Sequence, residues 1–184
     1  VLLPKILGYW EEDGYDVSIF TIRGSSEAAQ QLAANNLDFA QMAGASIIIA
    51  NGEFDVPIRT LITNFALGWG LAVPADSPIQ TAADLKGKNI GIVSVSTGGV
   101  SLVKSFVKKA GLDPDTDISI IATGVGAQPL LALRNDQVQA LMYWSSALVG
   151  FQNNQPDLRI IKDPAWAELP DYSFATSQQM LDED

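Results

Sequence analysis

The sequence contains no cysteine and no histidine among its 184 residues. These absences exclude disulfides, cysteine-based zinc sites, cysteine nucleophiles and the serine–histidine–aspartate triad within this chain. Most common catalytic machinery is therefore missing, and we expect no cofactor and no metal site.

Positive charge is also scarce, because eleven Lys and Arg oppose twenty-one Asp and Glu. The resulting net charge of −10 repels phosphates, so we expect no nucleic-acid partner. No stretch reaches the roughly 18 uncharged apolar residues of a membrane span. The longest candidate, Phe65 to Ala75, contains two glycines and a proline, so we expect no membrane insertion.

What the chain does contain is an alternation of helical and strand patterns, with 47% hydrophobic residues to form a core. Helices are predicted at Leu2–Glu12, from the cap Gly24–Glu27 through Ala34, and at Ala45–Ala50, Thr81–Leu85, Gly99–Ala110, Ala127–Asn135, Ser145–Gln152 and Ser177–Leu181. Strands are predicted at Asp16–Ile22, Leu37–Met42, Val56–Asn64, Asn89–Val93, Asp117–Ala122, Val138–Tyr143, Leu158–Ile161 and Tyr172–Thr176. The order predicts an α/β protein with doubly wound, mainly parallel sheets.

One pattern occurs twice, at residues 32–39 (LAANNLDF) and 133–140 (LRNDQVQA). Each is a helix end that runs into a buried strand. Asn35 and Asp136 occupy the turn, and both residue types tolerate the left-handed conformation that helix ends often need. The repeat predicts two similar αβ lobes, although unrelated helix–turn–strand junctions also resemble one another.

Four motifs, one of which occurs twice, resemble a known family. Residues 8–17 (GYWEEDGYDV), 76–91 (DSPIQTAADLKGKNIG) and 110–114 (AGLDP), together with the repeated junction, are similar to motifs of the solute-binding proteins of ABC importers. The resemblance is to their nitrate, sulfonate, taurine and thiamine-precursor group. Asn35 and Asp136 replace the glycine usual in that family, and Gln139 replaces an aspartate.

The resemblance implies a type 2 periplasmic-binding-protein-like fold, in which two lobes close on a ligand like a hinge. Lobe one is expected at residues 1–73, with 171–184 beginning its return, and lobe two at 74–170. Lobe one is expected to be incomplete in this chain, because family members carry further elements on both sides. The joints are predicted near Ala72–Asp76 and Leu169–Tyr172, beside prolines.

Ligands of open α/β sheets bind beyond the carboxyl ends of the strands, near helix N-termini. Small and hydroxyl-bearing residues recur in five such loops, at Arg23–Ser26, Ala43–Ser46, Ser94–Gly99, Thr123–Gly126 and Tyr143–Ser146. The candidate ligand-binding residues are Arg23, Gly44, Ala45, Ser46, Trp69, Ser96, Thr97, Gly98, Gly99, Thr123, Gly124, Tyr143 and Trp144.

Each candidate also has a plain structural interpretation. The Ser96–Gly99 segment offers hydroxyls and close backbone amides to an anion, or it is an ordinary helix cap. Tyr143 and Trp144 are predicted to stack on a less polar ligand part, whereas Trp69 either stacks or packs in the core. Arg23 either pairs with a ligand anion or is a solvated charge.

The predicted function is capture of a small organic solute, expected to be anionic, for delivery to the membrane subunits of an ABC permease. The location implied is periplasmic or otherwise extracytoplasmic, with the signal peptide outside this chain. Two alternatives stay open. One is an enzyme of the same fold, a thiamine-precursor synthase or a sulfinate-cleaving enzyme, whose chemistry looks dependent on His and Cys. The other is the ligand-sensing domain of a regulator.

Overall fold

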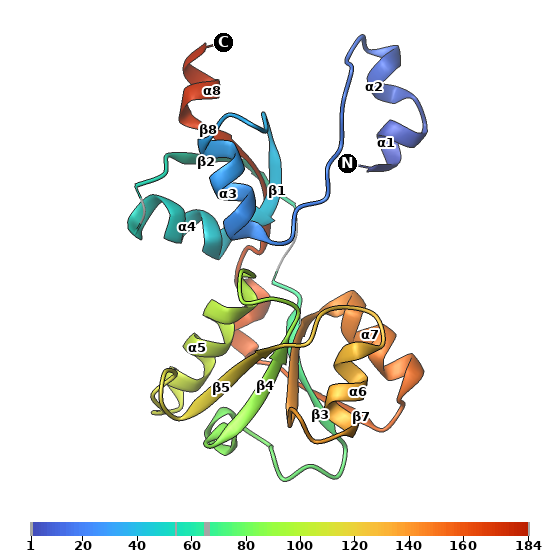
Figure 1. Ribbon diagram of the computed structural model, residues 1–184, viewed down its shortest axis with the longest axis vertical. Coiled ribbons are helices and arrows are strands. Elements are labelled where there is room, and N and C mark those ends of the chain that lie inside the picture. The colour runs from blue at the N-terminus through green and yellow to red at the C-terminus, as the bar shows by residue number, and fades with distance from the viewer. Residues whose placement is uncertain (1, 54, 65–66, 184) are drawn as a thin grey trace.

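The computed structural model describes residues 2–53, 55–64 and 67–183, and it contains two β-sheets flanked by helices (Figure 1). The chain crosses from the first sheet to the second after Thr63 and returns before Tyr172. Phe65 and Ala66, part of the longest apolar stretch, lie outside the described residues.

The first sheet has three strands, with β8 in the centre. In spatial order they are β1 (Ala40–Ala43), β8 (Tyr172–Ser177) and β2 (Ile58–Thr63). Helices α3 (Ser25–Ala33) and α4 (Gly44–Glu53) bury a small aliphatic core against these strands, and α8 (Gln178–Glu183) follows β8. The first sheet therefore depends on a strand that comes from the far end of the chain.

The second sheet has five strands. In spatial order they are β5 (Ile118–Ala122), β4 (Lys88–Ile92), β6 (Ala140–Trp144), β3 (Trp69–Pro74) and β7 (Leu158–Ile161). One face packs against α5 (Gly99–Lys109) and the 3-10 helices η1 (Ala82–Leu85) and η2 (Pro164–Glu168). The other face packs against α6 (Gln128–Arg134) and α7 (Ser145–Asn154). Successive residues of β3 and β6 alternate between these two cores, as a doubly covered sheet requires.

Strand direction follows the predicted parallel arrangement except in the two strands that enter a sheet from the other one. β4 is parallel to β5 and β6, whereas β3 is antiparallel to β6 and β7. In the first sheet β8 is antiparallel to β1 and β2. β3 and β8 each begin at the end of their sheet that faces the other sheet, and this is the end where the neighbouring strands finish. Each therefore runs antiparallel to its neighbours.

β3 also corrects an expected boundary. Residues 69–73 were predicted to end lobe one, but they pair with β6 and β7 in the second sheet. The crossing therefore lies between Thr63 and Trp69, not near Ala72–Asp76. The strand was missed because Gly68, Gly70 and Pro74 suggest a loop, although the run is buried and apolar like other interior strands.

The N-terminal segment differs from the prediction. The expected helix Leu2–Glu12 is divided into α1 (Leu2–Ile6) and α2 (Tyr9–Glu12), because Gly8 adopts a left-handed φ of +79°. The expected strand Asp16–Ile22 is extended chain that forms no ladder with any described strand. Alternating apolar residues suit a strand, but a strand also needs a neighbour for its backbone groups.

The repeated junction was predicted correctly. Asn35 and Asp136 have φ values of +54° and +55°. In both places the N–H of the following residue donates to the carbonyl five residues back, at 2.9 Å. This is the hydrogen bond of a Schellman helix ending, so the two junctions share one local geometry.

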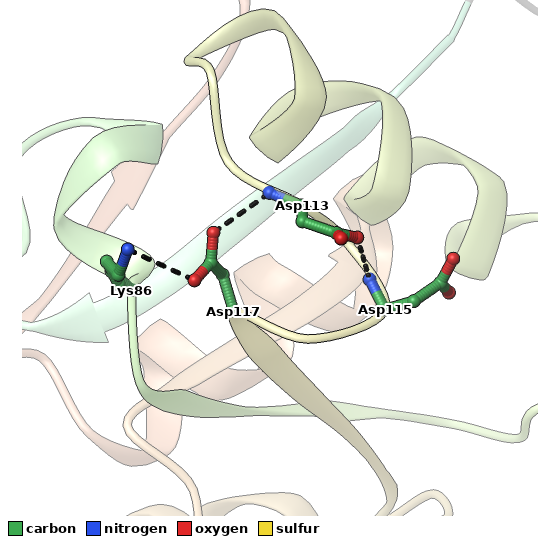
Figure 2. Close-up of polar contacts among 4 residues, drawn as sticks. All are labelled: Lys86, Asp113, Asp115 and Asp117. Atoms are coloured by element: carbon green, nitrogen blue, oxygen red, sulfur yellow. Dashed lines mark hydrogen bonds and ion pairs between the residues drawn. The ribbon is translucent and has the colours of Figure 1, made fainter.

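Acidic side chains of the α5–β5 turn bond to backbone N–H groups of the turn and to lysines beside it (Figure 2). Asp117 accepts a hydrogen bond from the N–H of Asp113 at 2.9 Å and pairs with Lys86 at 3.2 Å. These two contacts lower the pKa of the Asp117 carboxyl, the backbone bond contributing most. Asp113 in turn accepts from the N–H of Asp115 at 2.9 Å. The cluster is thus a hydrogen-bonded turn that holds β5 next to β4.

Candidate ligand-binding site

Three of the five predicted loops meet where the two sheets face each other, and Figure 1 shows the loop before α5 reaching the first sheet. The N–H of Ser26 donates to the carbonyl of Ser96 at 3.5 Å. A Cβ on Gly24 would lie 2.8 Å from the Ser96 carbonyl oxygen, and a Cβ on Gly98 would lie 2.8 Å from Ala43 Cβ. Glycine at both positions permits an approach that a side chain would block.

The N-termini of three helices from two sheets therefore converge. They are α3, α4 and α5, with nine, ten and eleven residues. Amides of a first helical turn lack intrahelical partners and carry positive partial charge. Within the described residues, no protein group accepts a hydrogen bond from the amides of Ala45, Ser46, Gly98 or Gly99. This arrangement favours a bound anion.

The hydroxyls of the Ser94–Gly99 loop are engaged inside the loop. Thr97 Oγ1 donates to the carbonyl of Ser94 at 2.9 Å, and the hydroxyl oxygens of Ser94 and Ser96 lie 2.9 Å apart. In the first sheet, Ser25 Oγ accepts from the N–H of Ala43 at 2.9 Å and ties α3 to β1. These bonds tie the loops together, and the first-turn amides of α4 and α5 remain available as donors.

Trp69 and Asp171 lie together beneath the helix ends. Trp69 is 2% exposed, its indole N–H donates to the Asp171 carboxylate at 3.0 Å, and its ring packs directly against Gly99. The N–H of Gly44 donates to the carbonyl of Asp171 at 2.7 Å. Burial therefore supports core packing for Trp69, the alternative to stacking on a ligand.

Asp171 is a buried acidic residue, with 6% of the residue exposed. Burial raises its pKa, while hydrogen bonds from the Trp69 indole and the Gly68 backbone oppose that rise. Its negative charge also raises the pKa of Tyr172, which burial raises most. Asp171 thus connects the second crossing segment to both α4 and β3.

Tyr143 holds two predicted loops together. Its side chain is 1% exposed, and its hydroxyl lies 3.0 Å from Thr123 Oγ1 and donates to the carbonyl of Gly124. Burial raises the pKa of the Tyr143 phenol, and the Thr123 hydrogen bond opposes this. A buried ring with an occupied hydroxyl supports a positioning role. Trp144 is half-buried, with its ring centroid 6.0 Å from that of Trp69.

Two candidates keep side chains without protein partners among the described residues. Arg23 is exposed next to the converging loops and forms no ion pair there. Ser46 is 6% exposed, and its hydroxyl lies 3.8 Å from the position of a Cβ on Gly98. The Ser46 hydroxyl therefore lies close to the start of α5, and Arg23 directly precedes Gly24 in the chain.

Sequence reasoning missed Asp171 and the bridging role of Ser25. An acid between a proline and a tyrosine in a connection looks like a surface residue, and nothing in the sequence signals its burial. Ser25 lies in one of the five predicted ligand-binding loops. Its hydrogen bond with Ala43, however, depends on the position of β1 beside α3, which the sequence does not show.

The family model described as "ABC transporter, phosphonate, periplasmic substrate-binding protein" matches residues 10–184. The chain belongs to this family. Curated relatives from Brucella abortus, Brucella suis and Brucella melitensis, named as binding proteins, are 26% identical over 152 residues. The match covers 82% of this chain and 45% of each relative, so the chain spans less than half the length of these relatives.

Solved structures show the same fold. A protein from Bordetella bronchiseptica superposes with a TM-score of 0.81 at 24% identity, over 98% of this chain and 59% of that one. The periplasmic aliphatic sulphonate binding protein SsuA from Escherichia coli gives 0.78 at 16% identity, over 99% and 62%. The alkanesulfonate-binding SsuA from Xanthomonas axonopodis, bound to MOPS, gives 0.77 at 18%, over 99% and 63%.

These findings confirm the predicted family, the periplasmic substrate-binding proteins of ABC transporters, and the predicted type 2, two-sheet α/β fold. The family description specifies phosphonate, whereas the sequence motifs pointed to the sulfonate and nitrate group. In the part of the chain that the structure describes, no helix has the length and apolar character to span a bilayer.

Proposed function

We propose that this protein captures a small organic anion between two lobes and presents it to the membrane subunits of an ABC permease. The observation that carries the proposal is the convergence of the N-termini of α3, α4 and α5 from two different sheets. A helix N-terminus stabilises an anion by typically 0.3–1 kcal/mol, more where it is partly buried. The Ser26 amide of α3 is bonded to Ser96, so the free first-turn amides of α4 and α5 supply the donors of this site, in a chain with a net charge of −10.

The lobes correspond to the two sheets. Lobe one comprises the residues up to Asn64 and from Tyr172 on, and lobe two comprises residues 69–169. The two crossing segments run side by side, because the N–H of Leu67 donates to the carbonyl of Leu169 at 2.8 Å and the N–H of Asn64 to that of Tyr172 at 3.0 Å. Two short paired connections between rigid sheets form a hinge, so opening separates the loop contacts and admits ligand.

Ligand binding without turnover fits the chemistry of the site. The converging loops present backbone amides, hydroxyls and Arg23, and the chain has neither His nor Cys to act as general base or nucleophile. We expect a bound solute to be recovered unchanged after long incubation. The family description supports a periplasmic location and a permease as partner.

The proposal is tested by thermal shift with the anions methylphosphonate, ethanesulfonate and acetate, and with glycerol as neutral comparison. A ligand that binds only the folded state raises the melting temperature by mass action. We expect at least one anion to do so, and glycerol to have no effect. A panel in which no anion raises the melting temperature would contradict the proposal.

Ser46→Ala then tests the position of the ligand. Loss of a hydrogen bond to a charged group costs about 1.5–3 kcal/mol, roughly ten- to a hundredfold in affinity. Ser105→Ala is the matched control, because Ser105 lies on the exposed side of α5. Equal weakening by both variants, or by neither, places the ligand away from the α4 end.

A further inference from the structure

A groove of about 520 Å³ lies between α6 and α7. Its lining residues are Val125, Gly126, Ala127, Leu130, Leu131, Arg134, Tyr143, Trp144, Ala147, Gly150, Phe151 and Asn154. None of the residues whose amides form the proposed anion site, Ala45, Ser46, Gly98 and Gly99, lines this groove.

The groove is apolar along most of its length. Leu130, Tyr143 and Phe151 form a buried floor, with 6%, 1% and 6% exposure. Val125 and Leu131 lie on its rim and are 62% and 44% exposed. Large apolar side chains exposed along one trough indicate an interaction site more than a solvated surface.

The trough is also open over its middle. A Cβ on Gly150 of α7 would meet no atom within 4 Å. A larger side chain at this position therefore has room, and it would occupy the groove itself.

One end of the groove is polar and carries its single positive charge. Arg134 and Asn154 lie at the C-terminal ends of α6 and α7. Arg134 Nε donates to Gln155 Oε1 at 2.9 Å, which orients the guanidinium. Its two terminal nitrogens have no partner among the described residues, and none of the lining residues is acidic. An apolar trough that ends at an oriented guanidinium is complementary to an anion with an apolar tail.

We propose that this groove binds an anionic amphiphile, with the carboxylate or sulfonate head at Arg134 and the alkyl chain extending between α6 and α7 toward Trp144. The seven residues of α6 span about 10 Å, which sets the length of chain that fits. This second site does not depend on the anion site between the lobes.

Calorimetric titration with butanoate, hexanoate and octanoate tests the chain, and octanol tests the head. Complete burial of a methylene tightens binding about fourfold, and a groove open to one side gives about two- to fourfold per methylene. We expect this increase up to octanoate, weaker binding of octanol, and a loss of that preference in Arg134→Gln. Affinity that does not change with chain length would overturn the proposal.

Gly150→Leu tests the location. The leucine fills the trough, so we expect octanoate to bind at least about tenfold more weakly, while the melting temperature stays the same or rises because leucine favours a helix. Gly52→Leu is the matched control, since Gly52 is also an open helical glycine, in α4. If Gly150→Leu leaves binding intact, the groove is not the site.

Bromine quenching of tryptophan fluorescence tests the orientation. We expect 8-bromooctanoate to quench more than 2-bromooctanoate, and the difference to disappear in Trp144→Phe. Equal or reversed quenching would contradict the assigned direction.

Ser46→Ala separates the two sites, because it should leave octanoate binding unchanged. Weakening by Ser46→Ala but not by Gly150→Leu would place the alkyl chain between the lobes and overturn the groove proposal.

Discussion

Gly98→Ala is the substitution that addresses the contact between the sheets most directly. Gly98 has helical dihedrals, with φ −59° and ψ −20°, so alanine fits its backbone without strain. The added Cβ, however, would lie 2.8 Å from Ala43 Cβ in the other sheet. To reach an ordinary 3.4 Å contact, the two sheets must separate by roughly 0.6 Å at this point.

The size of the effect follows from the cost of overpacking, about 1–3 kcal/mol for an added carbon in a tight contact. Because the clash exists only when the loops touch, this cost acts on the closed arrangement and not on the fold of either lobe. It converts to a shift of about five- to 150-fold toward separated lobes. The melting temperature of each lobe should change little.

Small-angle scattering of the ligand-free protein measures this shift as an increase in the radius of gyration. Ala43→Gly removes the opposing Cβ, so the double variant Ala43→Gly/Gly98→Ala should return to the compactness of the wild type. A Gly98→Ala protein as compact as the wild type would refute the reasoning. So would an expansion that Ala43→Gly fails to reverse.

Three further predictions concern single residues. Burial raises the pKa of Asp171, so the folded protein binds this proton more tightly than the unfolded chain does. The stability that Asp171 contributes is therefore present below the ordinary Asp pKa of about 3.9, and it is lost as the pH rises through the pKa of the folded state. Asp171→Asn should remove this part of the pH dependence of the melting temperature; parallel curves would contradict it. Asn35→Ala should cost about 1–2 kcal/mol in chemical denaturation, because alanine resists left-handed φ, and Asn35→Gly should not. Lys86→Gln should raise the pKa of Asp117 in an NMR titration, and an unchanged value would mean that the Asp113 amide alone sets it.

Local chemistry explains what could be predicted from the sequence. Asn35 and Asp136 predicted left-handed turns, because few residue types tolerate that conformation. Both residues adopt it in the structure. Elements with a strong period and clear ends, such as α5 and β5, lie within a residue or two of their predicted bounds. These features depend on neighbours in the chain, which the sequence displays directly.

Pairing between distant segments is what the sequence did not display. Asp16–Ile22 has the composition of a strand, but no described strand lies beside it. β3 and β8 run against their neighbours because they cross between sheets, and only the positions of the crossings determine that direction. Gly70 made β3 look like a loop, because its close packing against α7 and β7 is a tertiary feature.

For the candidate site, loop positions were more predictable than side-chain roles. The rule that strand ends and helix starts gather at one edge selected the loops at Gly24, Ala43 and Gly98, which do meet. It did not distinguish Trp69 and Tyr143, whose polar atoms are satisfied in the core, from residues that face a ligand. Burial decides whether such an aromatic residue packs in the core or faces a ligand. The sequence pattern, an aromatic residue after a strand, is the same in both cases.

The central claim, capture of an anion at helix ends from both sheets, is tested most directly by NMR titration of the ¹⁵N-labelled protein with the anion that gives the largest thermal shift. We expect the amides of Ala45 and Ser46 in one lobe and of Gly98 and Gly99 in the other to shift together and to saturate with a single dissociation constant. Shifts confined to one lobe, or absent from these four amides, would contradict it.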